Sequence, residues 1–180
     1  MKGATALVPL CAESKWILDD ILEAARTAFG EEITITAVNG GAGFRTDGRQ
    51  PAASDIIKGL LPLRMDFSRV LGITNSDLFH PGVNHVFGFA DPGSRVSVIS
   101  LYRFRTGGVS AGKIACRAVK TAIHELGHTY GLRHCTDHRC VMFFSFNLAD
   151  TDYKSREFCG KCKDEISSRL KNPLQRKEVC

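Results

Sequence analysis

The sequence predicts a mixed α/β (α+β) domain: a twisted mixed sheet with helices packed on it and an antiparallel strand at its edge. Strand-like and helix-like segments alternate over the first two-thirds of the chain, and such alternation is typical of βαβ units with right-handed connections. An Asp-Pro-Gly turn at 91–93 joins two further strand-like segments closely enough for antiparallel pairing. The last part of the chain is rich in cysteine and lacks apolar periodicity, which predicts a small appended region.

The composition is that of an ordinary globular protein. Of the 180 residues, 43% are hydrophobic and 24% are charged, which is enough apolar material for one core. The net charge of +5 is low for a nucleic-acid-binding protein, so no nucleic acid partner is expected. No apolar run reaches the length of about 18 residues that a membrane span needs. The start of the chain carries one Lys and an apolar stretch broken by Pro9, which favours a first strand over a secretion signal and predicts a cytoplasmic location.

The N-terminal part of the chain is predicted to form one βαβ unit. Short apolar runs indicate strands at 4–9 and 32–38. Between them, apolar residues recur at helical spacing and charged residues occupy the opposite face, which predicts an amphipathic helix over 13–29 that ends at Gly30. Residues 39–51 contain four glycines and are expected to form a loop.

The middle of the chain is expected to supply a second helix and three more strands. The helix covers 52–61 and stops before Pro62, because proline cannot continue a helix from inside it. A buried strand follows at 68–74. The antiparallel pair is formed by strands at 84–90 and 95–103.

A long helix is predicted over 112–130, after a glycine-rich stretch, and a short helix near 163–171. We divide the chain at the end of the long helix. Residues 1–131 are expected to form an N-terminal α/β subdomain and residues 132–180 a C-terminal, cysteine-rich subdomain.

The most informative motif lies on the long predicted helix. His124 and His128 are four residues apart, so both imidazoles project from one helix face toward a single ion. Glu125 is rotated away from that direction and lies close enough to meet a metal-bound water without binding the metal. Gly131 can adopt the left-handed conformation that reverses the chain and brings in His134 as a third nitrogen ligand. Three neutral imidazoles and a water are the ligand set of a catalytic zinc ion.

Seven cysteines require a second explanation. An odd number of cysteines without a secretion signal argues against a disulfide framework. Four of them form two closely spaced pairs, a pattern that predicts a tetrahedral structural zinc ion: Cys135, Cys140, Cys159 and Cys162. The other three are expected to be unpaired and inert: Cys11, Cys116 and Cys180.

The two predicted metal sites share one stretch of chain. Cys135 directly follows His134, so the structural zinc would hold the backbone beside the third imidazole. Met142 comes two residues after Cys140, so the same clamp places a methionine near the catalytic metal. Ordinary core packing is the alternative role for this methionine. His138 lies between the first two cysteines and is the less favoured alternative ligand.

The pattern HExxHxxGxxHCxxxxCxM…CxxC over 124–162 resembles the archaemetzincin branch of the metzincin clan of zinc peptidases. The order of the upstream strands and helices is also similar to that family's N-terminal subdomain. The resemblance implies a metzincin-like fold with two Zn²⁺ ions per chain, Glu125 as general acid/base and Met142 as the Met-turn residue under the catalytic metal. It implies these ligands: His124, His128 and His134 for the catalytic zinc, and Cys135, Cys140, Cys159 and Cys162 for the structural zinc.

The principal hypothesis is hydrolysis of peptide bonds by a zinc-bound water that Glu125 activates. By resemblance, the peptide substrate is expected to bind extended along the edge strand near 84–90. Tyr130 is a candidate for polarising the substrate carbonyl, although a helix aromatic is more often part of the core. One alternative is a zinc-stabilised module that binds peptide or nucleic acid with little or no hydrolysis. Another is an enzyme fold that has become a peptide binder or acts only on a narrow substrate.

Overall fold

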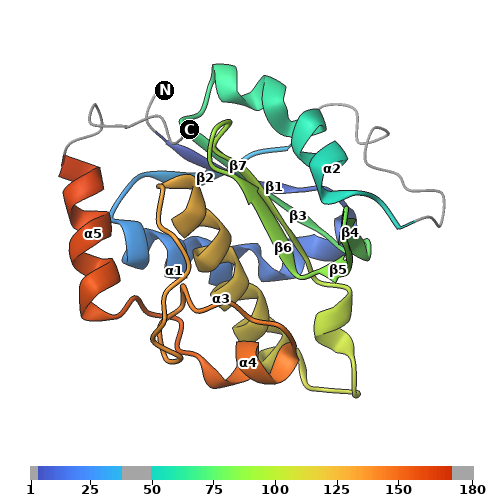
Figure 1. The fold of residues 1–180 in the computed structure, drawn as a ribbon. Coiled ribbons are helices and arrows are strands. Elements are labelled where there is room, and N and C mark those ends of the chain that lie inside the picture. The colour runs from blue at the N-terminus through green and yellow to red at the C-terminus, as the bar shows by residue number, and fades with distance from the viewer. Residues whose placement is uncertain (1–3, 38–49, 172–180) are drawn as a thin grey trace.

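The computed structural model describes residues 4–37 and 50–171, which form a sheet with helices on both faces (Figure 1). The strands are β1 (Thr5–Pro9), β2 (Ile33–Ile35), β3 (Arg69–Thr74), β4 (Leu78–His80), β5 (Val83–Val86), β6 (Gly88–Asp91) and β7 (Val96–Ser100). The α-helices are α1 (Leu18–Phe29), α2 (Ala53–Leu60), α3 (Ala111–Thr129), α4 (Leu148–Tyr153) and α5 (Gly160–Lys171). Three short 3-10 helices join them: η1 (Ala12–Ile17), η3 (Leu61–Met65) and η4 (Arg103–Arg105).

The main sheet has the strand order β2-β1-β3-β7-β6. The first four strands run parallel, and β6 pairs with β7 in the antiparallel direction, from Gly88 opposite Ile99 to Asp91 opposite Val96. This arrangement confirms the predicted mixed sheet with an antiparallel edge strand. Because the chain reverses at the Asp-Pro-Gly turn, β6 lies at the edge beside α3.

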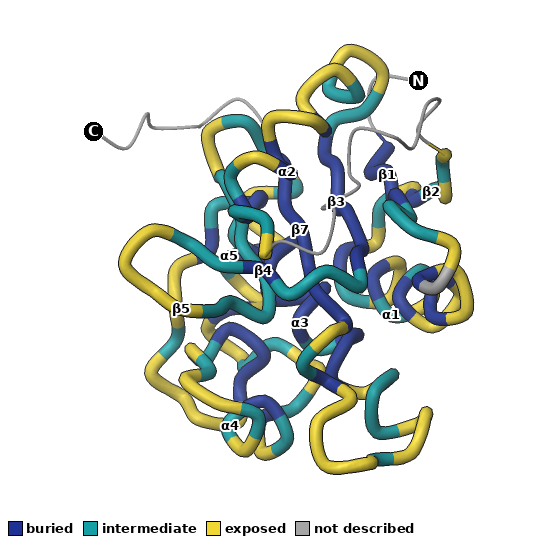
Figure 2. Tube along the Cα trace, turned by 90° about the vertical axis from the view of Figure 1, so that its right-hand side faces the viewer, coloured by how far each residue is buried: buried dark blue, intermediate teal, exposed yellow. Residues whose placement is uncertain are grey.

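The two faces of the sheet bury two separate apolar clusters, because side chains alternate along each strand. Leu7, Leu71 and Ile99 belong to the cluster beneath α1 and α3. Their neighbours Val70 and Val98 belong to the cluster beneath α2. The central strands are therefore buried on both sides, as Figure 2 shows for β3 and β7. Continuous apolar runs of this kind are expected of parallel strands covered by helices.

The strand expected over 84–90 is wrong as a single element. The structure divides it into β5, which pairs with β4 in a separate two-stranded sheet, and β6 in the main sheet. Phe87 lies between the two, and its carbonyl accepts a hydrogen bond from the Ser100 amide at 2.8 Å. A period-2 pattern cannot reveal this change of partner, because both halves keep an extended backbone.

Several element boundaries also differ from those predicted. The helix expected over 13–29 begins as the 3-10 helix η1 and becomes α-helical only at Leu18. The strand expected over 95–103 ends at Ser100, whose hydroxyl accepts from the Tyr102 amide and donates to the Ser76 carbonyl, turning the chain. The predicted loop at 39–51 falls almost wholly outside the described residues.

The segment after α3 packs on the same core as the sheet. Leu132, Val141, Met142 and Ile166 are buried in one cluster with residues of α1 and α3. The short helix expected near 163–171 is α5, which begins earlier, at Gly160. The division of the chain at 131/132 stays a prediction. Within the described ranges, no helix is both long enough and apolar enough to cross a membrane.

Candidate metal centre and active site

Helix α3 carries the first half of the candidate site, and its two ends are well defined. Ser110 caps the start, with its side chain accepting from the Lys113 amide at 3.3 Å. At the other end Gly131 has a φ of +91°, the left-handed conformation predicted for it. The chain turns there and returns toward the helix face that carries His124 and His128.

Three imidazoles converge after this turn. The Nε2 atom of His128 lies 3.1 Å from Nε2 of His124 and 3.2 Å from Nε2 of His134. On the other side of two of the rings, Nδ1 of His124 donates to the Val141 carbonyl and Nδ1 of His128 to the Leu132 carbonyl, each at 2.8 Å. A carbonyl can only accept, so the proton of each of these two rings lies on Nδ1. Their Nε2 lone pairs therefore point toward one another.

This arrangement suits a cation. Lone pairs that face each other at about 3 Å repel unless a positive ion lies between them. Ligands at 2.0–2.1 Å from a tetrahedral zinc ion are roughly 3.3 Å apart, close to the Nε2 separations found here. Nitrogen ligands backed by carbonyl acceptors are also typical of zinc sites, because the carbonyl fixes both the ring orientation and the tautomer. Burial lowers the pKa of His128 to about 4, and it lowers the pKa values of His124 and His134 as well.

Glu125 lies next to this cluster and is only 7% exposed. Burial raises the pKa of its carboxyl to about 8. The side chain packs against the backbone of the edge strand β6: a Cβ atom added at Gly88 would lie 2.6 Å from both Cγ and Oε1 of Glu125. Glycine at position 88 therefore lets the edge strand approach the carboxylate. The sequence alone contained no signal for this contact.

Met142 packs beneath the helix turn that links the first two imidazoles. Its side chain is fully buried, and a Cβ atom added at Gly127 would lie 2.5 Å from its Sδ atom. Met142 is thus part of the core, as the core-packing alternative predicts, and it also lies against Gly127 in the turn between His124 and His128. The glycine between the two histidines makes room for the methionine. The role of Met142 beneath a catalytic metal stays a prediction.

The four paired cysteines form a second cluster. Their Sγ atoms all lie within 4.8 Å of one another, with Cys135 Sγ 3.7 Å from Cys159 Sγ. Thiolates at about 2.3 Å from a tetrahedral zinc ion are roughly 3.7 Å apart, whereas a disulfide needs about 2.05 Å. Backbone amides point at the sulfurs: Cys159 N–H donates to Cys140 Sγ at 3.3 Å and Asp137 N–H to Cys135 Sγ at 3.4 Å. The donor set fits a zinc ion.

The two clusters are joined through a short parallel bridge. The Cys135 amide donates to the Met142 carbonyl at 2.9 Å, and Cys135 pairs with Phe143. His134 directly precedes Cys135, so this bridge holds the third imidazole. The alternative ligand His138 is not part of the sulfur cluster and packs instead against the Phe143 ring, with 4.3 Å between ring centroids.

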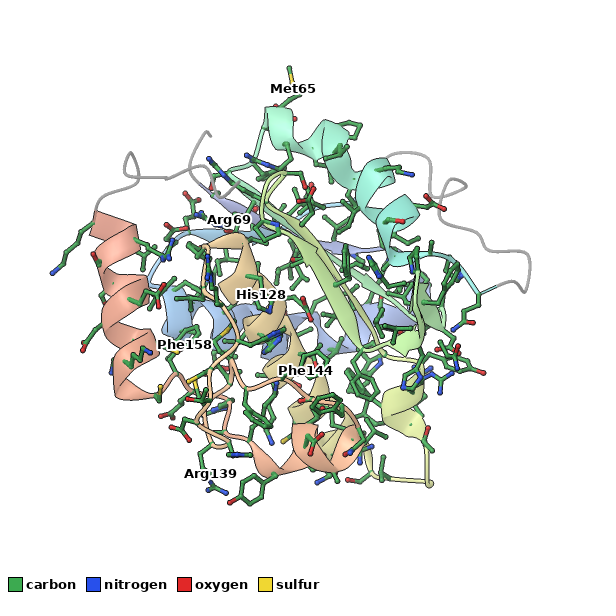
Figure 3. The ribbon with its side chains drawn as sticks, in the orientation of Figure 1. Met65, Arg69, His128, Arg139, Phe144 and Phe158 are labelled. Atoms are coloured by element: carbon green, nitrogen blue, oxygen red, sulfur yellow. The ribbon has the colours of Figure 1, made fainter. Side chains whose placement is uncertain are left out.

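A cleft of about 580 Å³ runs past the three imidazoles, between β5–β6 and the segment after Met142. Aromatic side chains form much of its wall. Phe144 packs edge-on against His134, with ring centroids 4.9 Å apart, and is 42% exposed, while Phe146 is 78% exposed. His128 and Phe144 are labelled in Figure 3. His80 and His85 also line this cleft.

Lys154, which follows α4, is a site residue that sequence reasoning missed. It lines the cleft and yet is only 3% exposed. Its Nζ atom donates to the Phe143 carbonyl at 2.9 Å and lies 3.4 Å from Nδ1 of His124. Burial lowers the pKa of this lysine to about 8, and the nearby Glu125 opposes that shift. A lysine in a polar stretch is normally a surface residue, so the sequence offered no sign of its burial.

Tyr130 lies outside the cleft. Its ring stacks on Phe29 at 4.5 Å and lies 3.4 Å under the Arg69 guanidinium, while its hydroxyl donates to Glu31 at 2.7 Å. These contacts agree with the core role rather than with polarisation of a substrate. Among the remaining cysteines, Cys11 and Cys116 are free thiols, and Cys180 lies outside the described residues.

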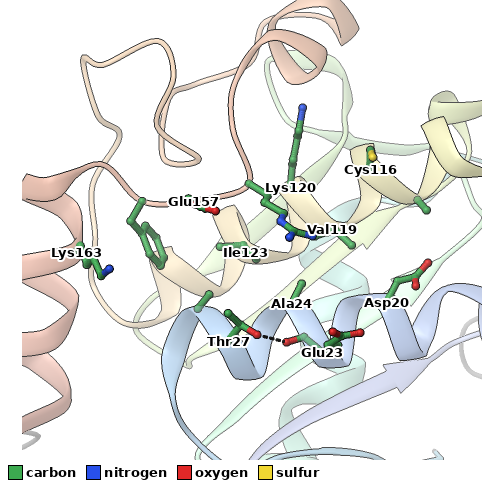
Figure 4. A pocket seen from close by; sticks show the side chains of 14 residues that line it. Asp20, Glu23, Ala24, Thr27, Cys116, Val119, Lys120, Ile123, Glu157 and Lys163 are labelled. Atoms are coloured by element: carbon green, nitrogen blue, oxygen red, sulfur yellow. Dashed lines mark hydrogen bonds between the residues drawn. The ribbon is translucent and has the colours of Figure 1, made fainter.

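A second cavity, of about 610 Å³, lies between α1, α3 and the segment before α5 (Figure 4). It opens on the other side of α3, with Ala24, Val119 and Ile123 on its walls and charged residues such as Lys120 and Glu157 at its margin. Within the part of the chain that is described, neither metal-ligand cluster includes a residue of this cavity. The three imidazoles and the Glu125 carboxylate line the cleft on the opposite side of α3 instead.

Comparison with known proteins agrees with this geometry. The sequence profile of Peptidase family M54 matches residues 47–168. The chain is 41% identical to an archaemetzincin of Pyrococcus abyssi over 133 residues, which are 71% of each protein. It is 40% identical to an archaemetzincin of Methanopyrus kandleri over 122 residues, 68% of this chain and 69% of the relative.

Solved structures agree in fold as well. The crystal structure of the Methanopyrus kandleri archaemetzincin superposes with a TM-score of 0.81 at 32% identity, covering 93% of this chain and 95% of that one. The archaemetzincin of Archaeoglobus fulgidus, solved complexed with malonate, gives a TM-score of 0.74 at 30% identity and covers 94% and 99%. The chain therefore belongs to peptidase family M54, the archaemetzincins, a family of zinc metallopeptidases.

Proposed function

We propose that this protein is a metzincin-type zinc peptidase that hydrolyses peptide bonds in the cleft beside α3. The observation that carries the proposal is the convergence of three Nε2 atoms next to a buried carboxylate. In this proposal His124, His128 and His134 hold the catalytic zinc ion. The four clustered cysteines hold a second, structural zinc ion: Cys135, Cys140, Cys159 and Cys162.

Glu125 is the proposed general acid/base. A zinc ion bound by the imidazoles would supply Lewis-acid polarisation of the substrate carbonyl. The Glu125 carboxylate takes a proton from the attacking water on one of its oxygens and passes it to the leaving amide nitrogen. Burial raises the pKa of this carboxyl, so its ionised form is a stronger proton acceptor than an exposed carboxylate. Met142 and Gly127 set the floor beneath this helix turn.

The peptide is proposed to bind extended along β6. In the described sheet this strand has a neighbour on one side only, so its other edge offers backbone groups for pairing. The proposal shifts the expected region from 84–90 to β6, Gly88–Asp91, because Gly88 of this strand lies against Glu125. A cytoplasmic location stays a prediction.

The direct test is the Glu125→Gln variant, compared with wild type on a peptide library with both proteins loaded with zinc. General acid/base catalysis contributes about 10²- to 10⁴-fold, so kcat/KM should fall by that much while zinc content stays at two ions per chain. Glu23→Gln, at an exposed position of α1 outside the cleft, serves as the control and should keep full activity.

Two results would contradict the proposal. Retained turnover in zinc-replete Glu125→Gln protein would remove Glu125 from the mechanism. A zinc-replete wild-type protein that cleaves no library peptide would instead favour the alternative of a peptide-binding module.

A further inference from the structure

The cleft contains a buried positive charge that the proposed mechanism does not use. Lys154 is 3% exposed, and within the described ranges no carboxylate oxygen lies within the 4.0 Å that defines an ion pair with its Nζ. Buried lysines are rare unless they are paired, because removing a charge from water is costly. Glu125 is close enough to interact electrostatically with Lys154, but it forms no direct ion pair with the ammonium group. An anionic group on a substrate would supply that direct partner.

The hydrogen bonds of this ammonium group leave donors available. It has three N–H groups, and the Phe143 carbonyl takes one of them at 2.9 Å. The nearby Nδ1 of His124 takes none, because its own proton is donated to the Val141 carbonyl. In the described structure, two N–H groups of Lys154 thus have no protein acceptor. The ammonium group lies at the inner wall of the cleft, beside the His124 ring, and the residue is among those that line the cleft.

The surroundings of Lys154 favour an anionic ligand. Among the described residues that line the cleft, Glu125 is the only carboxylate, and it is needed for the proposed reaction. The hydroxyls of Thr121 and Thr151, also in the lining, already donate to backbone carbonyls of their own helices or caps. Phe144 and Phe146 add apolar surface to the same cleft and supply no competing charge.

We propose that Lys154 is a specificity-determining residue that binds the side-chain carboxylate of an Asp or Glu next to the scissile peptide bond. This inference rests on the proposed peptidase function and deepens it by naming the substrate class: acidic peptides. The alternative role for Lys154 is purely structural, in which its bond to the Phe143 carbonyl only supports the segment after Met142.

The experiment compares peptides that differ in a single residue, Glu or Gln, placed on either side of the scissile bond. Gln has the same shape as Glu and lacks its charge, so the ratio of the two kcat/KM values reports charge recognition alone. A charge-assisted hydrogen bond corresponds to roughly tenfold or more, and this is the Glu/Gln ratio expected for wild type at one of the two positions. In Lys154→Met the ratio should fall to about one.

Lys120→Met is the matched control. Lys120 also anchors the α4 segment, with Nζ donating to the carbonyls of Thr151 and Asp152 at 3.0 and 2.9 Å, but it lines the cavity on the other side of α3. The Lys120→Met protein should be less stable than wild type but should keep the same ratio of Glu-peptide to Gln-peptide kcat/KM. Zinc content and thermal midpoint are measured for both variants, so that loss of folding is recognised.

A second readout does not depend on turnover. The same peptides are titrated calorimetrically into zinc-loaded Glu125→Gln protein, with and without Lys154→Met, and the Kd ratio should follow the kcat/KM ratio. Tighter binding of the Glu peptide without cleavage of any peptide by wild type would support the role of Lys154 and contradict the peptidase function. A wild-type ratio near one at both positions, or a ratio unchanged in Lys154→Met, would overturn the inference.

Discussion

The two metal-ligand clusters are built on opposite principles. The imidazoles of the first cluster come from one regular helix and the turn that follows it, and they border an open cleft. The sulfurs of the second cluster come from irregular chain and the start of α5, and they close around a single point. An open site leaves room for substrate, whereas a site closed by four protein ligands supports structure.

The backbone supports each cluster with the group that its ligands need. Two of the imidazoles must be neutral with Nδ1 protonated, and carbonyls of Val141 and Leu132 accept those protons. Thiolates need donors instead, and the amides of Cys159 and Asp137 point at sulfur. The direction of the backbone hydrogen bonds therefore differs between the two clusters, with carbonyls accepting from imidazoles in one and amides donating to sulfurs in the other.

The largest expected effect comes from removing a cysteine, which tests whether the imidazole cluster depends on the cysteine cluster more than the reverse. Cys140→Ser should remove the structural zinc and release the bridge between Cys135 and Met142, which also holds His134. We expect loss of both zinc ions, loss of activity and a drop of several kcal/mol in the free energy of unfolding. Elemental analysis and thermal denaturation measure these changes.

The reciprocal variant, His128→Ala, should lose only the zinc ion of the imidazole cluster and unfold close to the wild-type temperature. If Cys140→Ser instead retains one zinc ion and wild-type activity, the cysteine cluster does not support the imidazole cluster, and the predicted one-way dependence is wrong.

A smaller effect is expected from closing the gap between the edge strand and the carboxylate. In Gly88→Ala the new methyl group would lie 2.6 Å from Glu125, so the carboxylate must move. We expect kcat/KM to fall by about 10- to 100-fold, because small misplacements of a reacting group have effects of that size. Both zinc ions should remain. Gly112→Ala, where an added Cβ meets nothing within 4 Å, is the control, and equal kinetics in the two variants would refute the contact.

The smallest expected effect is a pH dependence of the free energy of unfolding that arises from the imidazole cluster and not from the cysteine cluster. After mild chelation that strips only the imidazole cluster, His128 has a folded pKa of about 4 against an ordinary 6.5. The unfolded chain then binds more protons, so the free energy of unfolding should be largest above pH 6.5 and decline as pH falls toward 4. Urea titrations across this range measure the decline. His128→Gln should make it shallower, and an identical slope would contradict the assignment.

The sequence predicted that the three histidines and the four cysteines would form two clusters, because the geometry of each cluster is largely local. Histidines at i and i+4, a glycine that ends the helix and short cysteine spacings depend on backbone rules that hold in any fold. The mixed sheet and its antiparallel edge were also accessible, since alternation and a tight turn limit the topologies. Helix α4 was missed, although Asn147 and Asp150 form a capping box that marks its start.

What the sequence could not provide depends on tertiary contacts. Gly88 matters because β6 passes over Glu125, and the two positions are 37 apart in the sequence with no common periodicity. The burial of Lys154 likewise follows from the packing of the segment after α4 against His124. The split of the expected strand at Phe87 has the same origin, because β5 finds its partner in β4.

The parallel sheet and the sulfur cluster also differ in the length of chain that each must close. Pairing of β1 with β3 brings together Ala4 and Ser68, 64 residues apart, whereas Cys135 and Cys159 are 24 residues apart. Longer closures carry more entropy loss and slow folding. The sheet with its crossovers is therefore the slow part of folding, and the metal-binding segment can order rapidly once α3 is docked. A chain synthesised without zinc should then be rescued by late addition of the ion without passing through global unfolding.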